Sequence, residues 1–304
     1  MMTVEAGSTG AADQPADATV CNSGPLAVVC GGGSLPFAVA ESAMRTGRRV
    51  VLFALRGSAD AKQVAGYPHH WVAVAQVGRL CRLARHEGCR DIVFIGTVLR
   101  PTVWQLRLDL AALWLLPRLA AMFRGGDAHL LAGVAGYFEQ RGFRVVGAHE
   151  IAPQILMPAG PLGACAPNER DRADIARGLA LLHAIGPFDV GQAVVVVDRR
   201  VLAVEAAEGT DHMLAHLAQL RRAGQVRAAG GSGVLVKAPK LGQDRRIDLP
   251  SIGPRTIEGA ARAGLAGIAV VAGSAVVAEP ELMVRAADRE KLFVLGVRDE
   301  ASDP

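Results

Sequence analysis

Two polar segments in the C-terminal part of the chain hold the residues best suited to phosphate chemistry. They span residues 204–211 and 236–250, and apolar stretches between them could carry both to one edge of a sheet. Their candidate ligands are Glu205, Glu208, Thr210, Asp211, Lys237, Lys240, Asp244 and Asp248. Carboxylate oxygens hold hard divalent cations, whereas lysine ammonium groups bind phosphate oxygens as point charges. Together they predict metal-assisted attack on a phosphate ester or pyrophosphate.

Asp248 is the first candidate among these carboxylates. It precedes Leu249-Pro250, and proline biases the preceding backbone to an extended conformation, so the carboxylate is held in place to bind a metal ion or orient water. We expect Glu208 and Asp211 to support it, with Thr210 as the N-cap of a helix that starts between them. Capping and surface charge alone would also explain that turn.

The glycine run Gly31-Gly32-Gly33-Ser34 lies between a predicted strand and a predicted helix. Backbone N–H groups at a helix N-terminus attract phosphate, so Gly32, Gly33 and Ser34 are candidate contacts. The dinucleotide fingerprint is not met, because Pro36 and its neighbour stand where its last glycine should fall. The alternative is a tight turn that needs glycine only for its backbone angles.

Four further positions are weaker candidates, each with an ordinary structural alternative. Gly96 and Thr97 follow a strand at the edge where open α/β sheets place ligands, but they also suit a plain loop. Asp127 is a natural helix N-cap. His149 follows a strand and could contact substrate, although an isolated histidine is more often structural.

The elements that must position these residues alternate strand and helix, which predicts an α/β fold with two domains. Residues 25–158 are expected to form a Rossmann-like, mainly parallel sheet with helices on both faces. Its strands are predicted at 26–30, 50–55, 71–75, 91–95 and 143–146, and its helices at 35–46, 77–86 and 128–140. Residues 165–300 are expected to form a catalytic α/β domain of different topology. Its strands are predicted at 193–197, 201–205, 234–237, 266–271, 275–278 and 292–297, and its helices at 171–185, from 210, 255–263 and 281–290.

Composition narrows the class of protein. The 304 residues are 51% hydrophobic, enough for a large core, and the formal net charge is only +4. Arginines are scattered and aromatics make up 4%, which argues against a nucleic-acid-binding face. Five cysteines without a CxxC pair suit a reducing cytosol. Residues 1–24 lack the basic and apolar regions of a signal peptide and are expected to be a disordered leader, so the predicted location is cytoplasmic.

Seven motifs occur in an order that resembles a known family. They are Gly31–Pro36, Gly126–Leu131, Gly142–Glu150, Asp189–Val196, Leu202–Asp211, Gly233–Lys240 and Arg246–Thr256. With this set the chain resembles the LpxI-type UDP-2,3-diacylglucosamine pyrophosphatases of lipid A synthesis, from about Leu26 to Val297. The leader has no counterpart in the resemblance.

The resemblance implies hydrolysis of UDP-2,3-diacylglucosamine to 2,3-diacylglucosamine 1-phosphate (lipid X) and UMP, in a site between two domains. It implies a divalent cation, Mg²⁺ or another such as Mn²⁺, and matches the family's essential aspartate to Asp248. A diacylated substrate also suggests peripheral contact with the cytoplasmic face of the inner membrane, for which residues 110–123 are a candidate. The sequence leaves a homo-oligomer open.

Two rival functions remain on the sequence alone. A nucleotide-dependent Rossmann oxidoreductase is disfavoured by the incomplete glycine fingerprint. A non-catalytic protein that binds a nucleotide sugar or lipid would bind the same substrate without releasing UMP.

Overall fold

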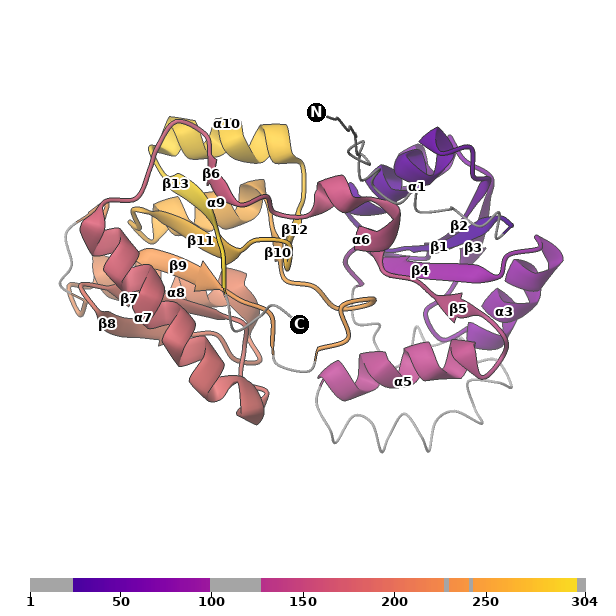
Figure 1. Ribbon diagram of the computed structural model, residues 1–304, viewed down its shortest axis with the longest axis horizontal. Helices are drawn as coiled ribbons and strands as arrows, with labels where there is room; N and C mark the ends of the chain where they lie inside the picture. The colour runs from indigo at the N-terminus through magenta and orange to yellow at the C-terminus, as the bar shows by residue number, and fades with distance from the viewer. Residues whose placement is uncertain (1–23, 99–126, 227–229, 241–242, 300–304) are drawn as a thin grey trace, which may run out of the picture.

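The computed structural model describes residues 24–98, 127–226, 230–240 and 243–299 of the chain. The expected leader up to residue 23 and the apolar segment 110–123 lie outside these ranges. Each half of the chain builds its own sheet, one formed by β1–β5 and the other by later strands (Figure 1). No helix in the described part of the chain is long and apolar enough to cross a membrane.

The N-terminal sheet is parallel throughout, in the order β3-β2-β1-β4-β5. Its strands are β1 (Leu26–Cys30), β2 (Val50–Leu55), β3 (His69–Val72), β4 (Asp91–Ile95) and β5 (Arg144–Val145). Every residue of β1 and β2 is buried, as expected of strands covered on both faces. The order is that of the first five strands of a Rossmann fold.

Helices cover both faces of this sheet. They are α1 (Leu35–Arg45), α2 (Ala61–Val64), α3 (Val77–His86), α5 (Asp127–Glu139) and α6 (Ala148–Ile151), followed by the short 3₁₀ helix η3 (Pro153–Ile155). Residues of α1 and α6 pack with one set of strand side chains, and residues of α3 and α5 pack with the alternate set. The predicted Rossmann-like domain is therefore confirmed as a fold class.

The C-terminal sheet is mixed, in the order β6-β13-β11-β9-β7-β8. Its strands are β6 (Gly160–Leu162), β7 (Ala193–Val197), β8 (Arg200–Val204), β9 (Val234–Lys237), β11 (Gly267–Val271) and β13 (Phe293–Val297). β9, β11 and β13 are parallel, while β6, β7 and β8 pair antiparallel. The second domain thus has the different topology that the sequence predicts.

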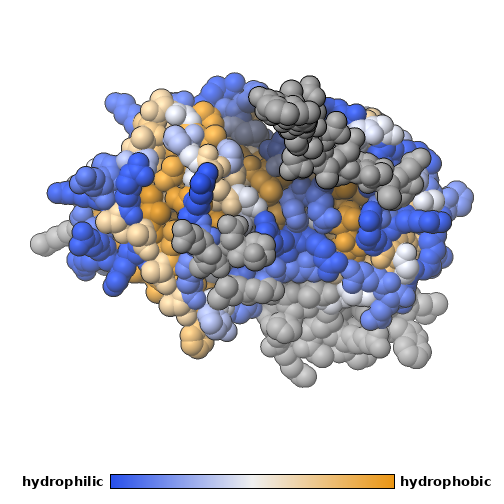
Figure 2. Space-filling model, in the orientation of Figure 1, coloured by the Kyte–Doolittle hydropathy of each residue, from blue (hydrophilic) through white to orange (hydrophobic). Residues whose placement is uncertain are grey.

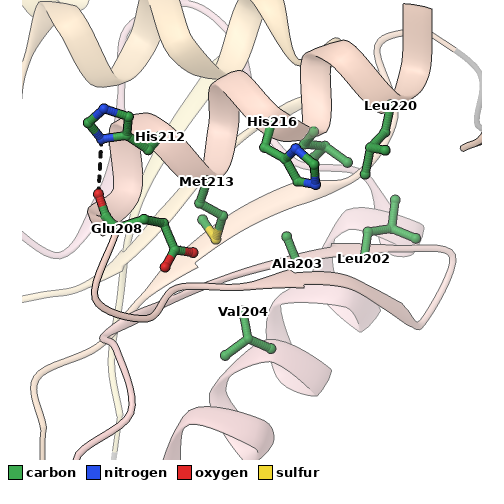
Figure 3. A pocket seen from close by; sticks show the side chains of 9 residues that line it. Leu202, Ala203, Val204, Glu208, His212, Met213, His216 and Leu220 are labelled. Atoms are coloured by element: carbon green, nitrogen blue, oxygen red, sulfur yellow. Dashed lines mark hydrogen bonds between the residues drawn. The ribbon is translucent and has the colours of Figure 1, made fainter. Parts of the chain in front are cut away.

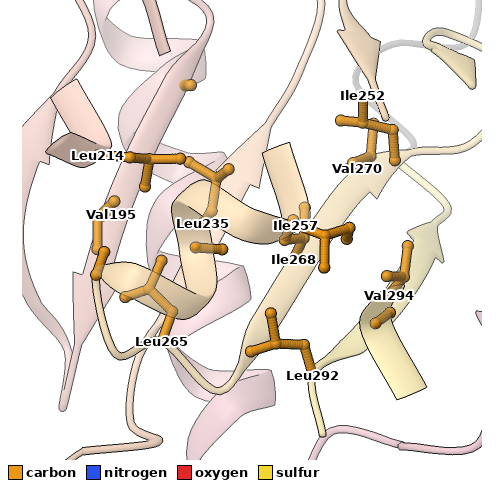
Figure 4. Close-up of a cluster of buried hydrophobic side chains, with 14 of the residues drawn as sticks. Val195, Leu214, Leu235, Ile252, Ile257, Leu265, Ile268, Val270, Leu292 and Val294 are labelled. Carbon is orange, nitrogen blue, oxygen red and sulfur yellow. The ribbon is translucent and has the colours of Figure 1, made fainter. Parts of the chain in front are cut away.

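Its helices are α7 (Glu169–Ile185), α8 (Gly209–Arg222), α9 (Pro254–Arg262) and α10 (Pro280–Glu290), with the 3₁₀ helix η4 (Gly186–Phe188) after α7. Side chains of α8, α9 and α10 bury one face of the sheet in the core shown in Figure 4, and α7 covers the other. A two-stranded parallel ribbon of β10 (Ser251–Ile252) and β12 (Val276–Val277) lies beside this core.

One predicted strand is displaced. β3 occupies His69–Val72 rather than residues 71–75, because the backbone of 69–72 pairs with β2. The chain leaves the sheet at Ala73, whose N–H donates to the side chain of Gln76. A side-chain acceptor there competes with the strand ladder and ends it.

Candidate active site

Asp248 lies at the end of a tight turn between β9 and β10. Its backbone N–H donates to the carbonyl of Asp244 at 3.0 Å, and the N–H of Ile247 donates to the same oxygen at 3.1 Å. The Asp244 carboxylate accepts from the Arg246 backbone and guanidinium at 2.7–3.0 Å. These hydrogen bonds from Arg246 lower the pKa of Asp244 below its ordinary value. Asp244 therefore shapes the turn that carries Asp248.

The same turn packs against the N-terminal domain. Ile247 joins the apolar cluster on the α3/α5 face of the first sheet, and Leu249 joins the cluster on its α1/α6 face. Arg246 also pairs with Glu139 at the end of α5, with 2.6 Å between Nη1 and Oε1. Asp248, between two anchors on opposite faces, is thereby held at the junction of the two domains, where the loop is seen in Figure 1. Hydrophilic residues gather along this junction in the space-filling view (Figure 2).

Lys237, at the end of β9, is the centre of a buried polar network. Its Nζ donates to Thr210 Oγ1 at 3.0 Å and to the carbonyl of Ser251 at 3.1 Å. The Thr210 hydroxyl donates in turn to Glu205 Oε1 at 2.7 Å. Lys237 and Glu205 are only 4% and 6% exposed, so each is the other's charge partner through one hydroxyl. Burial lowers the pKa of Lys237, against the opposing charges of Glu205 and Asp211.

The predicted capping role of Thr210 is wrong. α8 begins at Gly209 with Glu208 in the N-cap position, and no side chain forms a cap hydrogen bond there. The Thr210 hydroxyl is engaged with the buried lysine and glutamate instead. Sequence shows a threonine beside a helix start but not the buried charges that compete for its hydroxyl.

The remaining predicted charges are nearer to solvent. Lys240 Nζ pairs with Asp189 Oδ1 at 2.8 Å, and its backbone N–H donates to Gln243 Oε1 at 2.9 Å. Asp211 lies 3.4 Å from Arg255 in a surface pair. The described residues hold no cluster of three or more histidine, cysteine, aspartate or glutamate side chains that could bind a metal. Glu208, Asp211 and Asp248 thus form no ready cage for a cation.

Glu208 lines a separate groove between β8 and α8. The cavity is about 460 Å³ and is mostly aliphatic, with two histidines on its helical side. Figure 3 shows the Glu208 side chain along this groove and the carbonyl of Glu208 bonded to His212 Nδ1, at 3.0 Å. His212 and His216 are four residues apart, a spacing that sequence inspection could have flagged for metal binding. Figure 3 shows their rings turned in different directions.

The two glycine loops of the N-terminal sheet bind each other. Gly32 N–H donates to the Thr97 carbonyl at 2.7 Å, and Thr97 N–H donates back to Gly32 at 2.9 Å. A Cβ on Gly31 would lie 2.7 Å from the carbonyl carbon of Gly96, so close approach of two backbones requires glycine there. The Gly32 N–H is consequently committed to the protein. A Cβ on Gly33 would meet open space, which leaves the Gly33–Ser34 end of the loop accessible.

The two other weaker candidates, Asp127 and His149, both lie on helices of the N-terminal domain. Asp127 is the first residue of α5, and its side chain lies outside the described residues. His149 lies on α6, and its Nδ1 is buried without a hydrogen-bond partner in the described structure. Arg245, one of the charged residues that the sequence places beside Asp248, has a buried Nε in the same condition. Its only sequence signal is its place in the Asp248 segment.

Comparisons with known proteins cover both domains. A family model described as the LpxI N-terminal domain matches residues 25–155, and one described as the LpxI C-terminal domain matches 158–295. The UDP-2,3-diacylglucosamine pyrophosphatase LpxI of Caulobacter vibrioides is 43% identical over 272 residues, which cover 90% of this chain and 97% of that protein.

The chain also has a weak likeness to solved structures, among them two UDP-glucose 4-epimerases with NAD. That of Thermus thermophilus is 13% identical with a TM-score of 0.29 and covers 92% of this chain and 88% of its own. That of Stenotrophomonas maltophila is 11% identical with a TM-score of 0.28 and covers 88% and 97%. Likeness at this level carries no argument about fold or function.

Proposed function

The chain belongs to the LpxI family, and from this membership we propose that it hydrolyses the pyrophosphate bond of UDP-2,3-diacylglucosamine. The products would be 2,3-diacylglucosamine 1-phosphate (lipid X) and UMP, as a step of lipid A synthesis. The observation that carries the proposal is the Asp248 turn, which is anchored in both apolar clusters of the N-terminal domain. Substrate bound between the domains would meet this carboxylate and the cationic side chains beside it.

Asp248 is assigned the central role because its backbone is fixed at the domain junction, between two residues that pack against the N-terminal domain. It would orient the attacking water or a water-bound cation at the pyrophosphate. Lys240, 20% exposed and paired at the surface with Asp189, could turn to a phosphate oxygen. Gly33 and Ser34 would approach the nucleotide by backbone contacts.

A divalent cation fits this site if the substrate phosphates and water supply most of its ligands. Mg²⁺ keeps several waters and is commonly held by one or two carboxylates together with substrate phosphates. Asp248 would serve as that carboxylate, with Asp211 or Glu208 as the candidate second ligand. When bound, the cation would neutralise charge on the pyrophosphate and favour departure of the leaving phosphate.

The substrate's acyl chains extend the proposal to the protein's surroundings. A diacylated sugar lies in a membrane, so we propose that the reaction takes place at the cytoplasmic face of the inner membrane. The segment 110–123 predicted to contact lipid lies outside the described residues, so that contact stays a prediction.

The test is release of UMP from UDP-2,3-diacylglucosamine by the purified full chain, with Mg²⁺, with Mn²⁺ and with EDTA. We expect release with either metal and none with EDTA. Binding of substrate without UMP release would make this a non-catalytic binding protein. If a nicotinamide cofactor binds, as detected by fluorescence, and no UMP is released, the result would instead favour an oxidoreductase.

A further inference from the structure

Two side-chain nitrogens at the domain junction have no hydrogen-bond partner in the described structure. They are Nδ1 of His149, on α6, and Nε of Arg245, in the turn that carries Asp248. Both atoms are buried, and buried polar groups in folded proteins are nearly always hydrogen-bonded. Because leaving such a group unpaired is costly, an unpaired pair beside a candidate active site indicates a missing ligand or water.

Both side chains are held in place by other contacts. Arg245 Nη2 donates to the carbonyl of Gly273 at 2.6 Å, which fixes the guanidinium. The His149 ring lies directly against Gly147, where a Cβ would come 2.4 Å from ring Cε1.

The electrostatics of the pair favour an anion. Burial and the positive charge of Arg245 lower the pKa of His149 below its ordinary value of 6.5. The lowered pKa favours the neutral ring, which can carry its single proton on Nδ1 and donate it to an acceptor. A negatively charged oxygen near both side chains would accept from Nδ1 of the neutral ring and, with charge assistance, from the Arg245 guanidinium.

We propose that an oxygen of the substrate pyrophosphate is the missing acceptor, so that one phosphate group bridges His149 of the first domain and Arg245 of the second. This rests on the proposed function, since it names the group that the site receives. Gly273, which holds Arg245, also lines a hollow of about 610 Å³ beside the segment 153–159 between the domains. The bridging phosphate would lie next to the turn of Asp248.

The test is calorimetric binding of inorganic pyrophosphate to the full chain at one fixed Mg²⁺ concentration. Arg245→Gln should weaken binding about 10- to 100-fold, the range expected for a lost charge-assisted hydrogen bond. His149→Leu should weaken it about tenfold, whereas His149→Asn, whose amide nitrogen can replace Nδ1, should stay within about threefold of wild type. Arg289→Gln, on an exposed side chain of α10, is the matched control and should change nothing.

Thermal unfolding separates a ligand contact from a structural one. His149→Leu removes a buried unpaired nitrogen, so its melting temperature should equal or exceed that of wild type while pyrophosphate affinity falls. Wild-type affinity in Arg245→Gln and His149→Leu would overturn the proposal and would indicate that water occupies the gap. Failure of the wild type to release UMP, with pyrophosphate still bound through these residues, would overturn the proposed reaction but leave this subsite standing.

Discussion

Replacement of Lys237 by methionine tests which of two roles this lysine has. It either binds a substrate phosphate or stabilises the fold through its buried hydrogen bonds to Thr210 and Ser251. Methionine has a similar length but no charge, so it removes both hydrogen bonds of Nζ and leaves Glu205 buried without its charge partner. Breaking a buried ion pair by removing one partner costs about 3–5 kcal/mol. At roughly 3 °C per kcal/mol for a domain of this size, we expect the melting temperature to fall by about 10–15 °C.

Lys240→Met is the matched control, because Lys240 lies in the same segment and forms a surface pair with Asp189. A pair of that kind contributes at most about 1 kcal/mol, so the control should melt within about 3 °C of wild type. Circular dichroism melts of both variants measure the difference. A second substitution, Glu205→Leu, should recover part of the lost stability of Lys237→Met, because it removes the stranded charge.

One result would refute this reasoning. If Lys237→Met melts within about 3 °C of wild type while the KM for UDP-2,3-diacylglucosamine rises more than about tenfold, the ammonium is a substrate ligand and the network contributes little stability. If Lys237→Met has both the stability and the kinetics of wild type, the network of Lys237, Thr210 and Glu205 does not stabilise the fold.

Three further outcomes follow from the same contacts. Asp248→Asn should lower kcat about a thousandfold or more in the UMP-release assay with its melting temperature nearly unchanged, and near-normal turnover would remove Asp248 from the mechanism. Gly31→Ala should destabilise by about 2–3 kcal/mol because its Cβ would strike backbone, whereas Gly136→Ala, a helical position facing open space, should stabilise by about 0.5–1 kcal/mol in denaturant titrations. Hydrogen bonds from Arg246 lower the pKa of Asp244 below its ordinary value of 3.8. The full stabilisation from this pair is therefore present at pH values above 3.8, and it is lost as the pH falls through the lowered pKa. Asp244→Asn should therefore melt below wild type at neutral pH and converge with it in acid; a constant difference across a pH series would contradict this.

The fold was largely predictable because its strands are buried runs bounded by turn residues. Leu26–Cys30, Val50–Leu55 and Val234–Lys237 are apolar enough to be read without any homologue, and each occurs with its predicted bounds. The pairing of β3 was not readable, because its position depends on register against β2. Short elements such as β6 and α6 carry too little periodicity to be seen.

The candidate site was predictable in composition but not in arrangement. Sequence names Glu205, Thr210 and Lys237 as polar and close together, but it cannot show that two of them are buried and so held by each other. It cannot show either that the Gly32 N–H is used by Thr97. Both facts depend on which surfaces meet, and those contacts join residues far apart in the chain.

The position of Asp248 is a property of the domain pairing rather than of its own domain. Ile247 and Leu249, on either side of it, are packed into the N-terminal clusters, so separation of the domains would release the turn from both sides. Arg246 adds a charged link to α5, and Arg245 holds the turn to Gly273 of its own domain. A carboxylate fixed in this way is correctly placed only when the domains are together. That arrangement would couple hydrolysis to enclosure of the pyrophosphate, because the groups proposed to bind it come from both sides of the junction and the carboxylate that acts on it is placed by both.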